Sequence, residues 1–247
     1  MSSSSLTLLP SSNRATCAAR RTAAAALLLG VLLAGCGSSG SKDASATTVG
    51  TASGATSSGT FSDYFPHEVG DTWVYRLSGS VTDTATEKIT AVDRQRDGSS
   101  VVTMSYHSQA HPNFDHATEY LLYADGRLGI LPQNIDFADG RQLKAGFSAV
   151  TYPSLEDLRA GRSATGTITA PLGKSTTDTI SLPWTVQGEG TARVTVPFGT
   201  FDTLAVRESL GPDASFGTTY YAKGVGGVKV EEAGSLTELI SFTAVKG

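Results

Sequence analysis

Apolar and polar side chains alternate at every second position along most of the chain after residue 60. This period is typical of β-strands that bury one face, because successive side chains of a strand point to opposite sides. The pattern gives about ten such runs, which predicts a domain built mainly from strands. In the clearest five runs, the side chains expected on the buried face are Trp73, Tyr75 and Leu77; Val102, Met104 and Tyr106; Ile180, Leu182, Trp184 and Val186; Ala192, Val194 and Val196; and Ile240, Phe242 and Ala244.

Glycine-containing turns separate these runs at short intervals. Residues 96–98 (Arg-Asp-Gly) precede one strand, residues 124–126 (Ala-Asp-Gly) divide two others, and residues 197–200 (Pro-Phe-Gly-Thr) divide a further pair. Tight turns of this kind join neighbouring strands as hairpins. Strands joined by short turns form antiparallel sheet.

One segment departs from the two-residue period. Residues 153–159 are expected to form one or two helical turns, since Ser154 is a suitable N-cap and Gly161 a suitable stop. The rest of residues 61–247 predicts one mainly β domain. A long sheet must cover its apolar face, so we expect a strongly curved antiparallel sheet, in the form of a half-barrel or a barrel, with one short helix.

Two segments without strand character precede this domain. Residues 37–60 consist almost entirely of Ser, Thr, Gly and Ala, which offer little apolar surface to bury. Residues 36–60 are therefore predicted to be a disordered linker that begins with Cys36. Before the linker, Arg20 and Arg21 stand ahead of an apolar run at residues 22–34. This run is shorter than the roughly 20 apolar residues of a membrane-spanning helix, so residues 1–35 are predicted to be a signal peptide.

The apolar run ends in Leu33, Ala34, Gly35 and Cys36, which resembles the bacterial lipobox. The resemblance implies that a diacylglyceryl group is transferred to the Cys36 thiol and that the chain is cleaved between Gly35 and Cys36. Two acyl chains anchor a protein stably where one is marginal. The implied location is extracytoplasmic, on the outer face of the plasma membrane or, in a cell with two membranes, on the outer membrane. An ordinary secretory signal and a twin-arginine signal are the alternatives.

Loss of the signal peptide makes the protein more acidic. The full chain has 19 Lys and Arg against 23 Asp and Glu, and three of the arginines lie within residues 1–35. The remainder carries 16 basic and 23 acidic side chains, so its net charge is −7 rather than −4. This balance argues against a nucleic-acid partner, whose phosphates require a basic surface. The two cysteines are Cys17 and Cys36, so the domain itself contains no disulfide.

The candidates for metal ligands are His107, His111 and His116, with Asp115 beside them. Their spacing matches no known zinc motif, and the residues after His111 are typical of a loop. We therefore predict an exposed polar loop and no metal site. No Gly-x-Ser-x-Gly nucleophile motif follows the linker, so neither an enzyme nor a bound cofactor is expected.

Aromatic side chains are frequent at the positions of the predicted buried face. Most of them are expected to fill the core. Ligand pockets are mostly apolar with a few polar groups, so some aromatic residues are candidates for lining a pocket for an apolar ligand. These candidates are Trp73, Tyr75, Tyr106 and Trp184.

Three motifs resemble a family of uncharacterised secreted bacterial β proteins, the DUF3108-like proteins. They are FPHEVGDTWVY at residues 65–75, VPFGTFDT at 196–203 and YYAKGVGGVK at 220–229. The resemblance covers the beginning and the last quarter of the domain. It implies an antiparallel fold and, through a remote relation to curved-sheet carriers of the LolA type, a hydrophobic cavity. It implies no catalytic residues.

These observations favour a cell-envelope lipoprotein that binds or carries a lipid or another apolar molecule inside its sheet. The alternative is a structural or protein-interaction lipoprotein of the envelope, whose core is filled. An extracytoplasmic hydrolase is the third hypothesis. The membrane is the expected partner through the anchor at Cys36, and the apolar ligand or an envelope protein is the expected partner of the domain.

Overall fold

The computed structural model describes the following parts of the chain: residues 59–112, 115–130, 150–171, 179–210 and 215–245, with the backbone of 134–136, 142–144 and 146–147. Within them the protein is mainly β, with one antiparallel sheet and one short α-helix, which confirms the predicted fold class. The predicted signal peptide, Cys36 and nearly all of the linker lie outside the described residues. No helix in the described part of the chain is long and apolar enough to cross a membrane.

Thirteen strands form the sheet, in the order β8-β10-β11-β12-β13-β14-β15-β1-β2-β3-β4-β5-β9. It consists of two meanders, β1 to β5 and β10 to β15, joined where β1 pairs with β15. A separate hairpin contains β6 and β7. The strand bounds are β1 Thr72–Gly79, β2 Asp83–Arg94, β3 Ser100–Ser108, β4 His116–Leu122, β5 Leu128–Ile130, β6 Asn134–Asp136, β7 Gln142–Lys144, β8 Gly146–Phe147, β9 Val150–Thr151, β10 Ser163–Pro171, β11 Thr179–Val196, β12 Gly199–Leu210, β13 Ser215–Ala222, β14 Gly226–Glu232 and β15 Ser235–Thr243.

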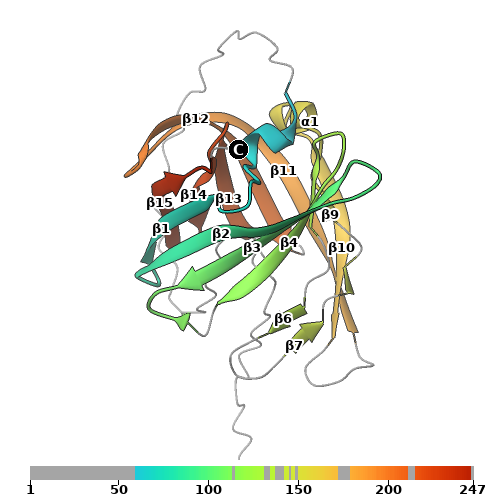
Figure 1. The fold of residues 1–247 in the computed structure, drawn as a ribbon, viewed down its shortest axis with the longest axis horizontal. Helices are drawn as coiled ribbons and strands as arrows, with labels where there is room; N and C mark the ends of the chain where they lie inside the picture. The colour runs from blue at the N-terminus through green and yellow to red at the C-terminus, as the bar shows by residue number, and fades with distance from the viewer. Residues whose placement is uncertain are drawn as a thin grey trace, which may run out of the picture.

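The sheet curls until its two edges lie close together, as Figure 1 shows. The edge strands β8 and β9 pair with β10 and β5 at opposite ends of the sheet. Yet Phe147 ends β8 and Val150 begins β9, so the chain itself connects the two edges. Three residues span at most about 11 Å. The strand β9 also lies beside β10. The result is a nearly closed barrel with an interior face.

Four of the five predicted stripes agree with the burial of the described side chains. On β1 and β3 the predicted residues are buried and their neighbours are more exposed. The predicted stripes on β11 likewise face the interior, although the side chains of Ile180 and Leu182 lie outside the described part. The buried residues of the four stripes are Trp73, Tyr75, Leu77, Val102, Met104, Tyr106, Trp184, Val186, Val194 and Val196.

The fifth predicted stripe is wrong at Ile240 and Ala244, whereas Phe242 packs against the core as predicted. Leu239 is buried, whereas Ile240 and Ala244 are exposed. The cause is a β-bulge, because β15 has one residue more than β1 between two of its pairs, and Ile240 is the residue without a partner. The extra residue changes the phase of the alternation. Leu239 and Phe242 therefore both turn inward, and Phe242 stacks on Trp73 with ring centroids 5.2 Å apart.

The predicted helix is confirmed as α1, Leu155–Arg159. The Ser154 hydroxyl accepts a hydrogen bond from the Asp157 backbone N–H and caps the first turn. Gly161, at a φ of 72°, allows the chain to leave the helix. The helix buries Leu155 and Leu158 against the sheet.

A short 3-10 helix that was not predicted, η1 (Phe61–Tyr64), directly follows the linker. The Ser62 N–H donates to the Gly126 carbonyl over 3.0 Å, which ties η1 to the turn after β4. Phe61 is buried, and its ring lies 5.3 Å from that of Tyr152 and 5.2 Å from that of Tyr221. The first turn of the domain therefore inserts an aromatic ring into the interior of the sheet.

Gly188 of β11 allows the closest approach of α1 to the sheet. A Cβ at Gly188 would lie 1.7 Å from the Leu158 carbonyl oxygen. We expect Gly188→Ala to displace α1 and to lower the free energy of unfolding, measured in urea, by about 1–3 kcal/mol. Gly227→Ala is the matched control, because its nearest neighbouring atom is 3.5 Å away. Equal stability of the two variants would contradict the tight contact of α1.

Candidate binding site in the sheet interior

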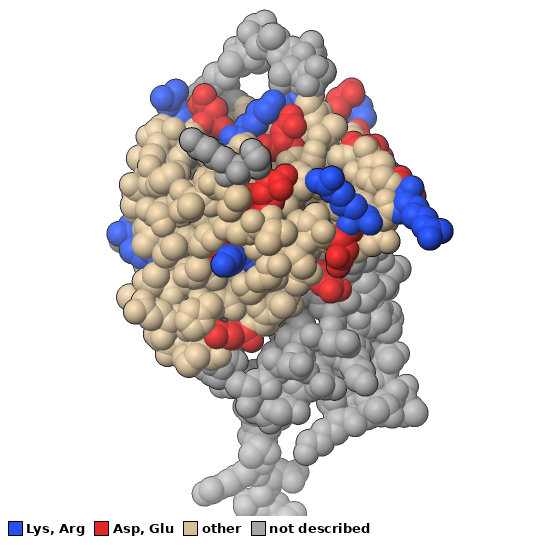
Figure 2. Space-filling view, in the orientation of Figure 1, with Lys and Arg blue, Asp and Glu red and all other residues tan. Residues whose placement is uncertain are grey.

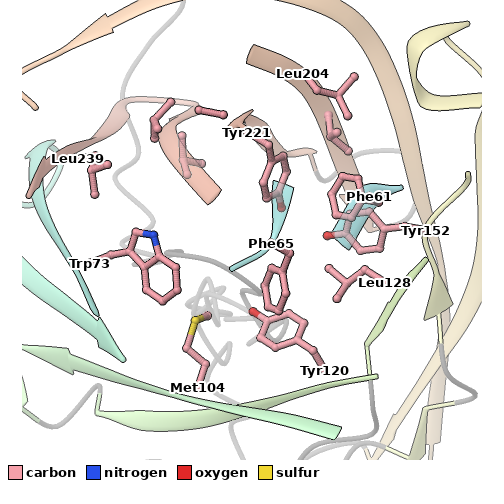
Figure 3. Packing of buried hydrophobic residues seen from close by; sticks show 14 of the residues in the cluster. Phe61, Phe65, Trp73, Met104, Tyr120, Leu128, Tyr152, Leu204, Tyr221 and Leu239 are labelled. Carbon is pink, nitrogen blue, oxygen red and sulfur yellow. The ribbon is translucent and has the colours of Figure 1, made fainter. Parts of the chain in front are cut away.

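The four predicted pocket residues all lie on the inner face of the curled sheet. Trp73 and Tyr75 come from β1, Tyr106 from β3 and Trp184 from β11, and each is at most 7% exposed. They belong to one continuous cluster of buried side chains. Figure 3 shows Trp73 within this cluster. The structure therefore brings the four residues to one interior, although burial alone suits a packed core as well as a pocket.

Two of these residues have their polar atoms bound to the backbone of β14 and the turn before it. The Trp73 indole N–H donates to the Val225 carbonyl over 2.5 Å, and the Tyr75 hydroxyl donates to the Gly227 carbonyl over 2.9 Å. These contacts join the motif at residues 65–75 to the motif at 220–229. The two motifs thus hold distant parts of the sheet together.

Two glutamates that the sequence analysis did not single out lie in the same interior. Glu87 of β2 is 2% exposed and Glu208 of β12 is 4% exposed. The sequence contains the signal for both, because each occupies the inward phase of an alternating run. Glu87 stands between Ala85 and Ile89, which are both fully buried. A buried carboxyl is unfavourable unless it is paired, so its presence requires an explanation.

Tyrosine hydroxyls surround the two carboxyls. The Tyr152 hydroxyl donates a short hydrogen bond to Glu208 Oε1. Among the described residues, the buried hydroxyls of Tyr106, Tyr120 and Tyr221 have no partner that meets hydrogen-bond geometry, although that of Tyr221 lies beside Tyr152. Figure 3 shows the hydroxyls of Tyr152 and Tyr221 pointing toward each other, while the ring of Phe65 lies beside Tyr120.

Glu87 carries a proton at neutral pH. Burial raises the pKa of Glu87 to about 8, against a smaller lowering by its hydrogen bond with Tyr75. The Tyr75 hydroxyl donates to the Gly227 carbonyl over 2.9 Å, and its contact with Glu87 is the weaker of the two influences on that carboxyl.

Burial also raises the pKa of Glu208 to about 7, while the hydrogen bond from Tyr152 lowers it. Glu232 of β14 is a third carboxyl with a raised pKa. Burial, followed by the charge of Glu208, raises the pKa of Glu232 to about 7. Among the described residues, none of the buried side chains is Lys, Arg or His. The negative charge of an ionised Glu87 or Glu208 therefore has no buried basic partner in that part of the protein.

The three candidate histidines lie near the end of β3, on the loop that follows it and at the start of β4, respectively. His107 Nδ1 is 2.6 Å from Asp115 Oδ2, and this pair is exposed. The ring of His116 stacks on Tyr106, with centroids 4.9 Å apart, and the backbone N–H of His111 donates to the Ser108 hydroxyl. No group of three His, Cys, Asp or Glu side chains in the described residues is arranged to hold a metal ion.

The same loop does not form a nucleophile with its base. The Ser108 hydroxyl donates a short hydrogen bond to Asp83, while His107 pairs with Asp115 instead. Asp83 also accepts from the backbone N–H of Ala110 over 2.8 Å. These bonds fix the loop, and they leave the serine facing a carboxylate instead of a histidine.

The outer surface shows no continuous patch of one charge on the face drawn in Figure 2. Basic and acidic side chains alternate there, mostly toward its upper edge. Ion pairs at the surface of the described residues include Arg76 with Glu238 at 2.7 Å and Arg162 with Asp157 at 2.5 Å. Exposed pairs of this kind contribute little to stability. The visible face gives no basic footprint for nucleic acid.

No protein-family model matches the chain, so the DUF3108-like resemblance stays a prediction. No curated protein matches it either. A structural match is a proposed lipoprotein from Parabacteroides distasonis, which is 14% identical with a TM-score of 0.49 over 73% of this chain and 98% of the other. A proposed exported protein with a YmcC-like fold from Bacteroides fragilis gives 14% identity and a TM-score of 0.49 over 72% and 98%. Likeness at this level carries no argument about function.

Replacement of Glu87 tests its neutral state. The folded pKa of about 8 lies above the reference value of 4.5, so the stability that the protonated group gives is complete below pH 4.5 and is lost as pH rises toward 8. We expect Glu87→Gln, which is neutral at every pH, to remove the loss of folding stability, on the order of 4 kcal/mol, that ionisation of Glu87 causes between pH 5 and pH 8. Urea unfolding at several pH values measures it.

This measurement uses residues 36–247 carrying Cys36→Ser, hereafter the soluble mature chain. The exposed Glu68→Gln is the control and is expected to follow the unaltered protein at every pH. If Glu87→Gln and Glu68→Gln gave the same dependence of stability on pH, Glu87 would be ionised in the folded protein.

Proposed function

We propose that this protein is an exported lipoprotein that binds a small amphiphilic molecule inside its curled sheet. The observation that carries the proposal is the group of buried polar atoms in the interior, above all the hydroxyls of Tyr106 and Tyr120, which have no hydrogen-bond partner in the described part of the chain. An unsatisfied buried group costs about 1–3 kcal/mol. Phenylalanine would fill the same space without that cost, so the hydroxyls indicate a molecule that completes them.

The surroundings of these hydroxyls are mostly apolar. Phe65 lies 5.0 Å from Tyr120 between ring centroids, and Met104, Leu128 and Ile130 are buried in the same cluster. A few polar groups within an apolar lining are the usual composition of a small-molecule site. The expected ligand therefore has an apolar body and at least one polar group.

The anchor belongs to the proposal as well. The lipobox-like residues that end in Cys36 support acylation of the thiol and a position outside the cytoplasmic membrane. A flexible linker of the length of residues 37–60 has a mean reach of roughly 25–30 Å. The domain would then stand close enough to the membrane to exchange an amphiphile with it.

A protein-interaction role is the second candidate, and exposed apolar side chains favour it. Phe198 is 41% exposed and Ile240 is 36% exposed. They are near each other, because the Phe198 N–H donates to the Leu239 carbonyl over 3.1 Å. Clusters of exposed apolar residues often mark contact surfaces. This surface and an interior ligand are compatible with each other.

A co-purified ligand is the expected result of native mass spectrometry on the soluble mature chain from several bacterial hosts. We expect an added mass that solvent extraction removes. The double variant Tyr106→Phe, Tyr120→Phe should carry less of this added mass, because it lacks the two hydroxyls that would bind the ligand. Phe198→Ser is the control for the alternative, since it changes only the exposed surface. Protein without added mass from every host, together with a bound protein lost in Phe198→Ser, would favour the interaction role.

Loss of the thiol tests the anchor. We expect Cys36→Ser in the full chain to move the protein from the membrane fraction to the soluble extracytoplasmic fraction, because no acyl chains can be attached. Fractionation and immunodetection measure the change, and Cys17→Ser is the matched control. Membrane association that survives Cys36→Ser would show that acylation of this thiol is not the anchor.

A further inference from the structure

The polar groups of the interior converge from the two opposite halves of the sheet. Glu87 and Tyr120 come from β2 and β4, whereas Glu208 and Tyr221 come from β12 and β13. The hydroxyls of Tyr120 and Tyr221 lie close enough to both glutamates for each carboxylate to act on them. Two carboxyls therefore bracket two hydroxyls in one place, and all four side chains are at most 4% exposed.

Aromatic faces border this group of four. The ring of Phe61 lies 5.2 Å from Tyr221 and 5.3 Å from Tyr152, and the ring of Phe65 lies 5.0 Å from Tyr120. Aromatic faces are negative at their centre and attract cations such as ammonium groups. Carboxylates surrounded by aromatic rings offer both attractions at once.

The charge balance of the interior indicates whether the ligand is a cation or an anion. Within the described residues no buried basic side chain compensates Glu87 or Glu208. A ligand carboxylate would add a third negative group and would find no cation. A ligand cation would supply the missing partner, and it would allow both glutamates to be ionised.

We infer that the interior binds the protonated amine of an amphiphilic ligand, with the Glu87 and Glu208 carboxylates as its counter-ions and the Tyr120 and Tyr221 hydroxyls as further acceptors. This inference rests on the proposed function, and it names the chemical class of the ligand. The apolar body of the ligand would contact the aromatic residues that surround the group.

Binding is then linked to release of protons from the two glutamates into solvent. Their pKa values of about 8 and about 7 mean that one or both must ionise when the amine binds near neutral pH. Affinity for the amine should therefore rise at least about tenfold from pH 6 to pH 8, the value expected when only the carboxyl with the lower pKa must ionise. The titratable groups that face Glu87 are Tyr75, Tyr106, Tyr120 and Tyr221, and those that face Glu208 are Tyr120, Tyr152, Tyr221 and Glu232.

The test compares three probes that share a ten-carbon alkyl body and differ in their terminal polar group. The probes are decylamine, decan-1-ol and decanoate. Isothermal titration into the soluble mature chain at pH 7 is expected to show decylamine binding at least about tenfold more tightly than the other two. Titrations in buffers of different ionisation enthalpy should show about one proton released for each amine bound and none for the alcohol. The measurement of proton release needs no substitution at Glu87 or Glu208, so it tests the inference even if such a substitution prevents folding.

Variants at the carboxyls give the matched comparison. Glu87→Gln and Glu208→Gln together should remove the preference for decylamine and its dependence on pH while decan-1-ol binds as before. Glu68→Gln should change neither. Equal or tighter binding of decan-1-ol or decanoate by the unaltered protein would overturn the amine assignment and leave the proposed function standing. Failure of all three probes to bind would overturn the proposed function itself.

Discussion

The pairing of β1 with β15 is the contact on which the rest of the structure depends. Each meander is made of neighbours in sequence, but β1 and β15 are joined across more than 150 residues, from Thr72 with Thr243 to Gly79 with Ser235. Closing such a long loop is entropically unfavourable. Side chains of β1 reinforce the closure, because Trp73 and Tyr75 reach past β15 and bind the backbone of the next hairpin. Without these contacts the two meanders would be separate open sheets with no interior.

The interior combines a stable core with groups that a stable core would exclude. Most inward positions carry the branched and aromatic side chains that a packed sheet requires. Glu87 and Glu208 break that rule at equivalent inward positions in the two meanders, and tyrosines rather than phenylalanines face them. Local violations of the rules of core packing are expected at functional sites. The polar centre is thus the most informative part of the molecule about its role.

The two-residue period predicted the fold class and four of five buried stripes, because a strand that buries one face alternates apolar and polar residues in its sequence. The capping residue Ser154 and the stop at Gly161 predicted the short helix. It could not show the bulge at Ile240, since the extra residue is defined by its partner strand. The four aromatic candidates were placed in one interior, but the partners Glu87 and Glu208 were missed. Their inward phase was visible, whereas their nearness to the same tyrosines, Tyr120 and Tyr221, depends on the closure of the sheet.

The two-residue length of both edge strands has a consequence for association between copies of the protein. An exposed edge offers free N–H and C=O groups to a strand of another molecule, and this is a common route to aggregation. Here the edge strand β8 consists only of Gly146–Phe147 and the edge strand β9 only of Val150–Thr151. The chain between them connects one edge of the sheet to the other. Neighbouring copies of the protein would therefore find little free backbone on these two edge strands to pair with.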